Sequence, residues 1–437
     1  MLFNKFKLSQ SNESQEDLVR TISLGLLKQP DFRNFWLGHT VSSFGVQITT
    51  VAIPLIAALT LEASALEMGI LTAVEFLPFL LISLFVGVWV DRKPKRPMMI
   101  GSDIMRAVVL IAIPIGLLLD VLTMPILYVI AALVGINTVI FEIAHVSYLP
   151  TVVKNDELVE GNSKLEFSSS SATVVGQSIG GALIQVFSAP LSILFNVGTY
   201  LLSALYLAFI KKQEEPIEVP EGTKQNMWAD IREGTTFVFQ NHVLRPILFG
   251  TVIFNLFTYV IEPIFILYIT RTLALAPIYI GLIFSMSGVG ALLGAIMAGP
   301  MVRRLGIGKT LVFSLFLAGF VSLIIPVATL LPTLPAVMLI MAMYMIDAAM
   351  VIVYNINQRS LRQAITPQHL QGRMNACIRM FGMGVVPIGA ILGGWLGDIM
   401  GTTPTLIVGA IGLMSSSIFI IFSSVRTISQ PTAAEGK

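Results

Sequence analysis

The sequence predicts an all-α membrane protein of twelve transmembrane helices, arranged as two pseudo-symmetric six-helix bundles. The first observation behind this is composition: of 437 residues, 55% are hydrophobic and 12% are charged, with a mean hydropathy of +0.83. Soluble proteins carry about 25% charged residues. The second is a set of twelve apolar segments of membrane-spanning length, and the third is a match between the two halves of the chain.

Each apolar segment is long enough to cross a hydrocarbon core about 30 Å thick. The expected spans lie near 34–60, 67–90, 98–120, 124–150, 164–187 and 190–210, and then near 244–270, 277–302, 310–330, 335–358, 373–400 and 403–425. We therefore divide the chain into an N-terminal segment 1–33, a bundle 34–210, a linker 211–243, a bundle 244–425 and a tail 426–437. The polar start lacks the pattern of a signal peptide, so we expect none to be removed.

The basic residues fix the expected orientation. All but two of the 27 fall in segments on the N-terminal side of the membrane; Arg271 is in a loop on the other side and Arg106 is within the third span. Because Lys and Arg accumulate in cytoplasmic loops, we expect both termini and the linker to be cytoplasmic.

The two halves repeat at a nearly constant offset. GVWVDR, beginning at Gly87, precedes GPMVRR, beginning at Gly299, by 212 positions, and the pair Gly180-Gly181 precedes Gly393-Gly394 by 213. Two such halves joined by a linker are the layout of an alternating-access transporter, with a substrate site between the halves. A duplicated scaffold without transport is the alternative.

The loop GVWVDRKPKRPMMI resembles the signature of the major facilitator superfamily, which implies the major facilitator fold. In that family this loop latches one half against the other, so the resemblance implies gating roles for Gly87, Asp91, Arg92 and Arg96. A simple cytoplasmic anchor is the alternative for the basic cluster. Three positions apart on one helix face, Asp103 and Arg106 are expected to form a pair that supports this gate.

A narrower resemblance is to bacterial exporters that include macrolide-efflux and enterobactin-exporter proteins, carried by FRNFWLGHTVSSFG, SDIMRA, ELVEGNSKLE and NQRSLRQAITPQHLQGRMNACIR. VVGQSIGGALI is similar to the family's antiporter signature and contains Gly176, Gln177, Gly180 and Gly181. Glycines four positions apart allow a neighbouring helix to pack closely. Gln177 stands where the usual signature has proline.

Ionisable residues at membrane depth cost roughly 3 kcal/mol or more, so each is a candidate functional residue. Desolvation favours the protonated form of a carboxylic acid, which lets it carry a proton between the two sides. The resemblance implies that the first, fourth, seventh and tenth spans line the cavity. The candidates for proton coupling and the substrate cavity are, in order of preference, Glu142, Asp347, Glu262 and Glu75, with His145 beside Glu142 and Gln47 on the wall of the first span. The alternative for each acid is a structural hydrogen bond to a neighbouring helix.

The sequence lacks the motifs of nucleotide binding, zinc binding, serine hydrolysis and disulfide formation. RRLGIGKT lacks the first glycine of a phosphate-binding loop, no zinc-type histidine cluster or G-x-S-x-G motif occurs, and the single Cys377 precludes an internal disulfide. We expect no enzyme, no cofactor, no metal and, at a net charge of +2, no nucleic-acid partner. The predicted partners are a small-molecule substrate, protons and the lipid bilayer, with the protein a monomer.

We therefore predict a proton antiporter of a bacterial cytoplasmic membrane that exports hydrophobic or amphipathic small molecules of the drug or multidrug type. Two alternatives stay open. One is a dedicated siderophore or metabolite exporter of the same fold, and the other is a transport-inactive membrane sensor.

Overall fold

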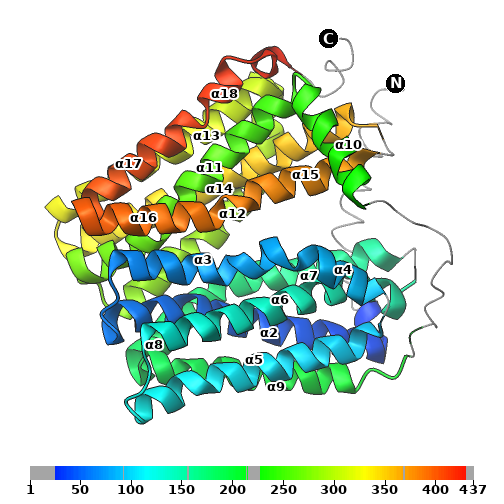
Figure 1. Cartoon of the computed structure of the whole chain (residues 1–437), viewed down its shortest axis with the longest axis vertical. Coiled ribbons are helices and arrows are strands. Elements are labelled where there is room, and N and C mark those ends of the chain that lie inside the picture. Colours follow the sequence, from blue (N-terminus) through cyan, green and yellow to red (C-terminus); the bar gives the residue numbers. More distant parts are fainter. Residues whose placement is uncertain are drawn as a thin grey trace, which may run out of the picture.

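The computed structural model describes residues 25–91, 93–154, 157–212, 214, 227–367 and 370–429, and the regular elements in this part of the chain are all helical (Figure 1). The bounds of the first group follow in chain order: η1 (Leu26–Lys28), α2 (Pro30–Leu55) with the π turn η2 (Ile56–Thr60), α3 (Ala65–Leu81), α4 (Ser83–Asp91), α5 (Lys95–Leu118), α6 (Met124–Val152), α7 (Leu158–Ser171), the π turn η4 (Ala172–Gly176), α8 (Gln177–Phe187) and α9 (Ala189–Ala208).

After the linker helix α10 (Met227–Gln240), a second group repeats this arrangement. Its elements are α11 (Leu244–Leu267) with the π turn η5 (Tyr268–Thr272), α12 (Pro277–Leu305), α13 (Ile307–Ile324) with η6 (Ile325–Leu330), α14 (Thr333–Ile365), α15 (Gln371–Gly384), α16 (Val386–Met400), α17 (Thr402–Ser415), α18 (Ile418–Ile421) and η8 (Ser424–Thr427). Lys211, Lys212 and α10 all belong to the stretch expected to be the linker.

Ten helices in the described ranges are long and apolar enough to cross a membrane. The second and fifth expected spans are the ones missing from this set. The second is divided at Ile82 into α3 and α4, and the fifth is the composite α7–η4–α8, which carries the polar run 168–171. Both composites nevertheless lie alongside the other spans of the first group (Figure 1).

Local sequence explains where several helices begin and end. Proline in the first turn starts α2, α6, α9 and α12, where its missing N–H costs nothing. Ser64 caps α3 in a capping box with Glu67. Gly306 and Gly401 have positive φ angles of 81° and 85°, which end α12 and α16 with a sharp turn.

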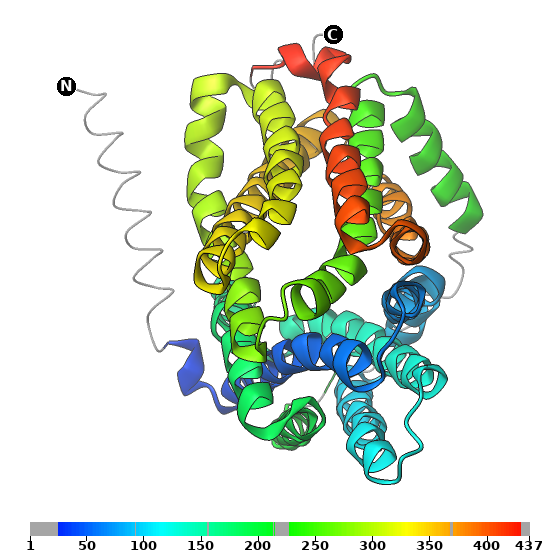
Figure 2. The same ribbon diagram turned by 90° about the vertical axis from the view of Figure 1, so that its left-hand side faces the viewer.

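The two groups form the lower and upper layers of Figure 1. We call the end that carries the starts of α2 and α11 the terminal end, and the end that carries η2 and η5 the far end. Helices α3, α8, α11, α12 and α16 make the main contacts between the groups. Figure 2, which looks onto the far end, shows α16 directly beside α3. Each group also has its own core toward the terminal end, around Phe32 and Phe35 in the first and Leu311 and Leu315 in the second.

Candidate functional site

Glycines bring the two groups into backbone contact in two symmetry-related places. A Cβ added at Gly281 of α12 would lie 2.6 Å from the Gln177 carbonyl oxygen and 2.8 Å from the Gly181 Cα. A Cβ added at Gly69 of α3 would lie 2.3 Å from the Ala390 carbonyl oxygen. Since real Cβ atoms do not approach backbone this closely, glycine is required at both places.

The glycines of the fifth span contact helices of both groups. Gly176 and Gly180 face α2, where added Cβ atoms would lie 2.9 Å from the Gln47 Cβ and 3.1 Å from the Ile48 Cα. Gly181, one position on, faces α12 of the other group. Gln47 is thus a half-buried packing residue opposite Gly176, and the buried Gln177 side chain leaves its Oε1 without a hydrogen-bond partner.

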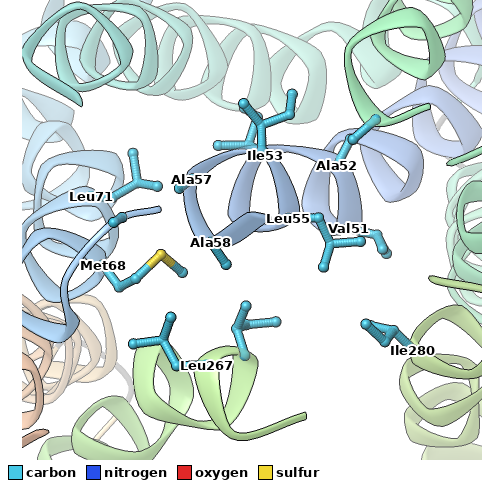
Figure 3. Close-up of a cluster of buried hydrophobic side chains, with 14 of the residues drawn as sticks. Val51, Ala52, Ile53, Leu55, Ala57, Ala58, Met68, Leu71, Leu267 and Ile280 are labelled. Atoms are coloured by element: carbon cyan, nitrogen blue, oxygen red, sulfur yellow. The ribbon is translucent and has the colours of Figure 1, made fainter. Parts of the chain in front are cut away.

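A cluster of apolar side chains fills the far end between the groups, and we call it the far-end cluster. Figure 3 shows Ala58 of η2, Met68 of α3 and Leu267 of α11 extending toward one another. Leu55 is fully buried, and Met68, Leu267 and Ile280 of α12 are 2% exposed or less. The far end is therefore sealed by side chains from both groups.

Two charged residues of the second group fasten this end by binding helix termini of the first. Arg271 in η5 donates to the carbonyl oxygens of Ala58 and Ala63, at 3.0 and 2.7 Å. Asp398 of α16 accepts from the backbone N–H groups of Ala65 and Leu66, at 2.9 and 3.2 Å. Asp398 thus places an anion at the free amides that begin α3, and Arg271 places a cation at carbonyl oxygens of η2 and of the link that follows it.

Two of the sequence-predicted acids lie on neighbouring helices at the junction of the groups. Glu75 of α3 and Glu262 of α11 both have exposed side chains, and the charge of Glu75 acts on Glu262. Tyr259 lies close to both acids, and its ring meets Phe76 of α3 edge-on, with ring centroids 5.1 Å apart. Glu75 lies ten positions after the start of α3, about 15 Å along this helix from the far end, so it is inside the span and not at its end.

Asp347 extends this set into α14. Its side chain is half-buried, and Tyr344 lies within electrostatic reach of both Asp347 and Glu262. We call Glu75, Glu262 and Asp347 the acid row. Its members come from both groups and from three different helices.

Glu142 lies apart from the acid row. Its exposed side chain on α6 feels the charges of Arg379, on α15 of the other group, and of Arg106, within its own group. His145, one turn further along, is buried between Phe35 and His39, with ring centroids 4.5 Å from each. Its Nε2 has no hydrogen-bond partner.

Asp103 and Arg106 form the expected pair within α5, buried inside the first group. The Arg106 guanidinium lies between the rings of Phe141 and Tyr200, 4.4 and 4.2 Å from their centroids. Stacking on two aromatic faces and an ion pair compensate for the burial of this charge.

The expected gating loop is only partly described. Arg92 lies outside the described residues, and Asp91 is the last residue of α4. A Cβ at Gly87 would meet nothing within 4 Å. Arg96 binds within its own group: its Nε donates to the Leu207 carbonyl oxygen at 2.8 Å, which ties α5 to the end of α9.

Sequence reasoning missed the contributions of Asp398 and Tyr259. Arg271 did carry a signal, because it is the one basic residue in a loop on the far side. The signal in Asp398 is an acid near the end of an apolar helix, which many structural residues share.

Two matched groups of spans, joined through small-residue contacts and carrying acids at membrane depth, define a multi-pass membrane transporter. The chain belongs to the Major Facilitator Superfamily, whose sequence pattern matches residues 35–390. The family predicted from the GVWVDR loop and the predicted fold are thereby confirmed.

Similar proteins include transporters of several kinds. The multidrug efflux pump Tap of Mycolicibacterium fortuitum is 25% identical over 385 residues, which cover 86% of this chain and 92% of Tap. An uncharacterized MFS-type transporter of Bacillus subtilis, YvqJ, is 23% identical over 82% of this chain and 84% of its own. The inward-facing structure of a bacterial homologue of the iron transporter ferroportin superimposes with a TM-score of 0.71 at 17% identity, covering 89% of this chain and 97% of that one; its outward-facing structure gives 0.55.

Proposed function

We propose that this transporter exports hydrophobic or amphipathic small molecules from a bacterial cytoplasm by proton antiport. The observation that carries the proposal is the acid row, in which Glu75, Glu262 and Asp347 are contributed by both groups at their junction. Acids placed between two moving halves meet one side of the membrane in one state and the other side in the next. Protonation on one side and release on the other would then couple proton flow to the exchange of states.

The orientation proposed from the basic residues identifies which side of the transporter is closed in this conformation. With both termini cytoplasmic, the far end faces outward, and its apolar cluster and the bonds of Arg271 and Asp398 close the outer side. The bundles 34–210 and 244–425 would rock about the glycine contacts. In the alternate state, the Asp91 loop and the Glu142–Arg379 region would approach as the cytoplasmic side closes.

The export direction is supported by similarity to Tap, whose name describes a multidrug efflux pump. Apolar and aromatic side chains around the acid row, such as Phe76 and Tyr344, suit an amphipathic substrate better than a strongly hydrated one. The protein would act as a monomer, since each chain contains both halves of the site.

The proposal is tested with purified full-length protein in liposomes under an imposed pH gradient. Proton movement and substrate movement are measured together, with macrolides, tetracyclines, dyes and catecholate siderophores as substrates. We expect a compound of the first three classes to move protons through the wild type. Asp347→Asn and Glu262→Gln should abolish this coupling, and Glu142→Gln should reveal whether the separate acid takes part.

Asp120→Asn is the matched control, because Asp120 is an exposed acid in the loop between α5 and α6. It should transport and couple normally. Substrate movement without protons, or normal coupling in all the acid variants, would overturn the antiport mechanism. Movement of the siderophores alone would favour a dedicated exporter, and no movement of any compound would favour a sensor.

A further inference from the structure

A groove runs over the outside of the second group at the terminal end, where the C-terminal segment crosses α13. It consists of two adjoining hollows of about 610 and 410 Å³ that share Leu305, Lys309, Ile421 and Arg426. Phe313 and Phe316 complete its apolar part. This groove faces away from the junction of the groups, so it is separate from the acid row.

Backbone contacts build the groove. The backbone N–H groups of Ile307 and Gly308 donate to the carbonyl oxygens of Ser429 and Ile428, at 3.2 and 3.0 Å. A Cβ at Gly308 would lie 2.0 Å from the Val425 carbonyl oxygen, so only glycine allows the segment to lie this close. The segment is thereby held against the first turn of α13, which brings Arg426 and Lys309 to the same groove.

The groove is polar at one end and apolar along its length. Lys309, Phe313 and Phe316 lie on one face of α13, and seven residues of helix place Phe316 about 10 Å deeper than Lys309. Phe313 and Phe316 are 45% and 43% exposed, and the ring of Phe316 stacks on that of Phe320, which continues the apolar surface. Two cations thus stand at the membrane surface above a strip of exposed aromatic side chains.

The two cations have no acid to neutralise them nearby in sequence. Neither 305–316 nor 417–429 contains Asp or Glu. Among the described residues, neither Lys309 nor Arg426 takes part in an ion pair, and both side chains are exposed. Within the part of the chain that the structure describes, the groove therefore presents two cations without an acidic partner at the level of lipid headgroups.

We propose that this groove is a binding site for an anionic phospholipid. Lys309 and Arg426 would hold the headgroup phosphate, and an acyl chain would lie along Phe313 and Phe316. Charge complementarity identifies the headgroup, since basic pockets between spans favour anionic lipids, and the apolar strip below accounts for the chain. The proposal depends on membrane insertion and not on the substrate or coupling ion of transport.

The test is native mass spectrometry of the full-length protein titrated with phosphatidylglycerol or with phosphatidylcholine of the same chains. Wild type should retain phosphatidylglycerol preferentially. Because each cation near the surface contributes about fivefold to the affinity for anionic lipid, Lys309→Gln with Arg426→Gln should lower retention about 25-fold. Lys211→Gln with Lys212→Gln, which removes two exposed cations outside the groove at the same end, is the matched control and should retain the lipid.

Phe316→Gln distinguishes lipid from a free phosphate. It should weaken binding of phosphatidylglycerol and leave binding of glycerol phosphate unchanged. Equal loss in the Lys211 and Lys212 control would show unspecific attraction and overturn the proposal, as would a glycerol phosphate affinity equal to that of the lipid. If the double variant does not fold, Lys309→Gln alone carries the test, with about fivefold expected.

Discussion

The two six-helix groups agree in backbone detail and differ in where they place charge. At the far end of α2, the N–H of Leu61 donates to the Ile56 carbonyl oxygen, and 212 positions later Leu273 donates to Tyr268 in the same way. The buried side chains inside the two groups do not match in the same way. The buried positions of Asp103 and Arg106 correspond to Leu315 and Ala318, which are equally buried. One fold thus accepts either an ion pair or an apolar pair.

The two groups also differ at the far end, where the charged residues that join them come from one group. Arg271 corresponds to Leu59, and Asp398 to Gln185, so both charged fastenings are supplied by the second group. Pro277 begins α12 where Ala65 begins α3. Because proline has no N–H, α12 could not offer the donor that Ala65 offers to Asp398. The glycine contacts are therefore symmetric, whereas the charged side chains that join the groups come only from the second group in these two places.

The largest expected effect concerns the buried pair. Arg106→Ala leaves the Asp103 carboxylate buried without its partner, which should lower the free energy of unfolding by about 3–5 kcal/mol. Adding Asp103→Leu copies Leu315 and Ala318 and should recover most of that loss. Thermal unfolding in detergent measures both. A double variant less stable than Arg106→Ala would show that the two groups do not share an interchangeable core.

The glycine contacts should come next. Gly281→Ala places a Cβ against the Gln177 carbonyl oxygen and should disfavour the packed far end by about 1–3 kcal/mol. Gly69→Ala should do the same, because the contact is symmetric. Transport rates in liposomes measure this, with Gly198→Ala as control, since a Cβ there meets nothing within 4 Å. Unequal effects of Gly69→Ala and Gly281→Ala would contradict the equivalence of the two contacts.

The charged fastenings should have a smaller effect. Arg271→Gln or Asp398→Asn removes charge-assisted bonds worth about 1 kcal/mol at these exposed positions, which should shift the population toward an open far end about fivefold. The rate at which a maleimide labels Leu55→Cys, in a Cys377→Ser background, measures this opening. Gln185→Ala, at the position equivalent to Asp398, should label at the wild-type rate.

The smallest effect is expected at Gln177. Its position corresponds to Ala390, and it meets Gly281 through its backbone carbonyl. Because its buried Oε1 has no partner, Gln177→Ala should change the free energy of unfolding by less than about 1 kcal/mol. A larger loss of thermal stability would mean that the side chain does more than fill space.

Much of the fold could be predicted because its determinants are local or periodic. Apolar length predicts spans, and the 213-position match between Gly180-Gly181 and Gly393-Gly394 predicts equivalent helix contacts. In each pair the first glycine packs within its own group and the second against the other group. The period alone could not show which neighbour each glycine meets.

The site was less predictable because it depends on which helices cross between the groups. The sequence favours Glu75 least of the four acids, because the resemblance implies that other spans line the cavity. In the structure α3 lies beside α11 and α16, which brings Glu75 to Glu262. The sequence favours Glu142 most, yet the charges that act on it are those of Arg379 and Arg106. The sequence of one helix does not indicate which helix of the other group it will contact.

The π turns η2 and η5 close with one residue more than an α turn and occupy the same place in both halves, 56–60 and 268–272. Their sequences differ, IAALT in the first half and YITRT in the second, so the same backbone turn forms with different side chains. The two turns therefore give a fixed point for superimposing the two halves where the side chains no longer match.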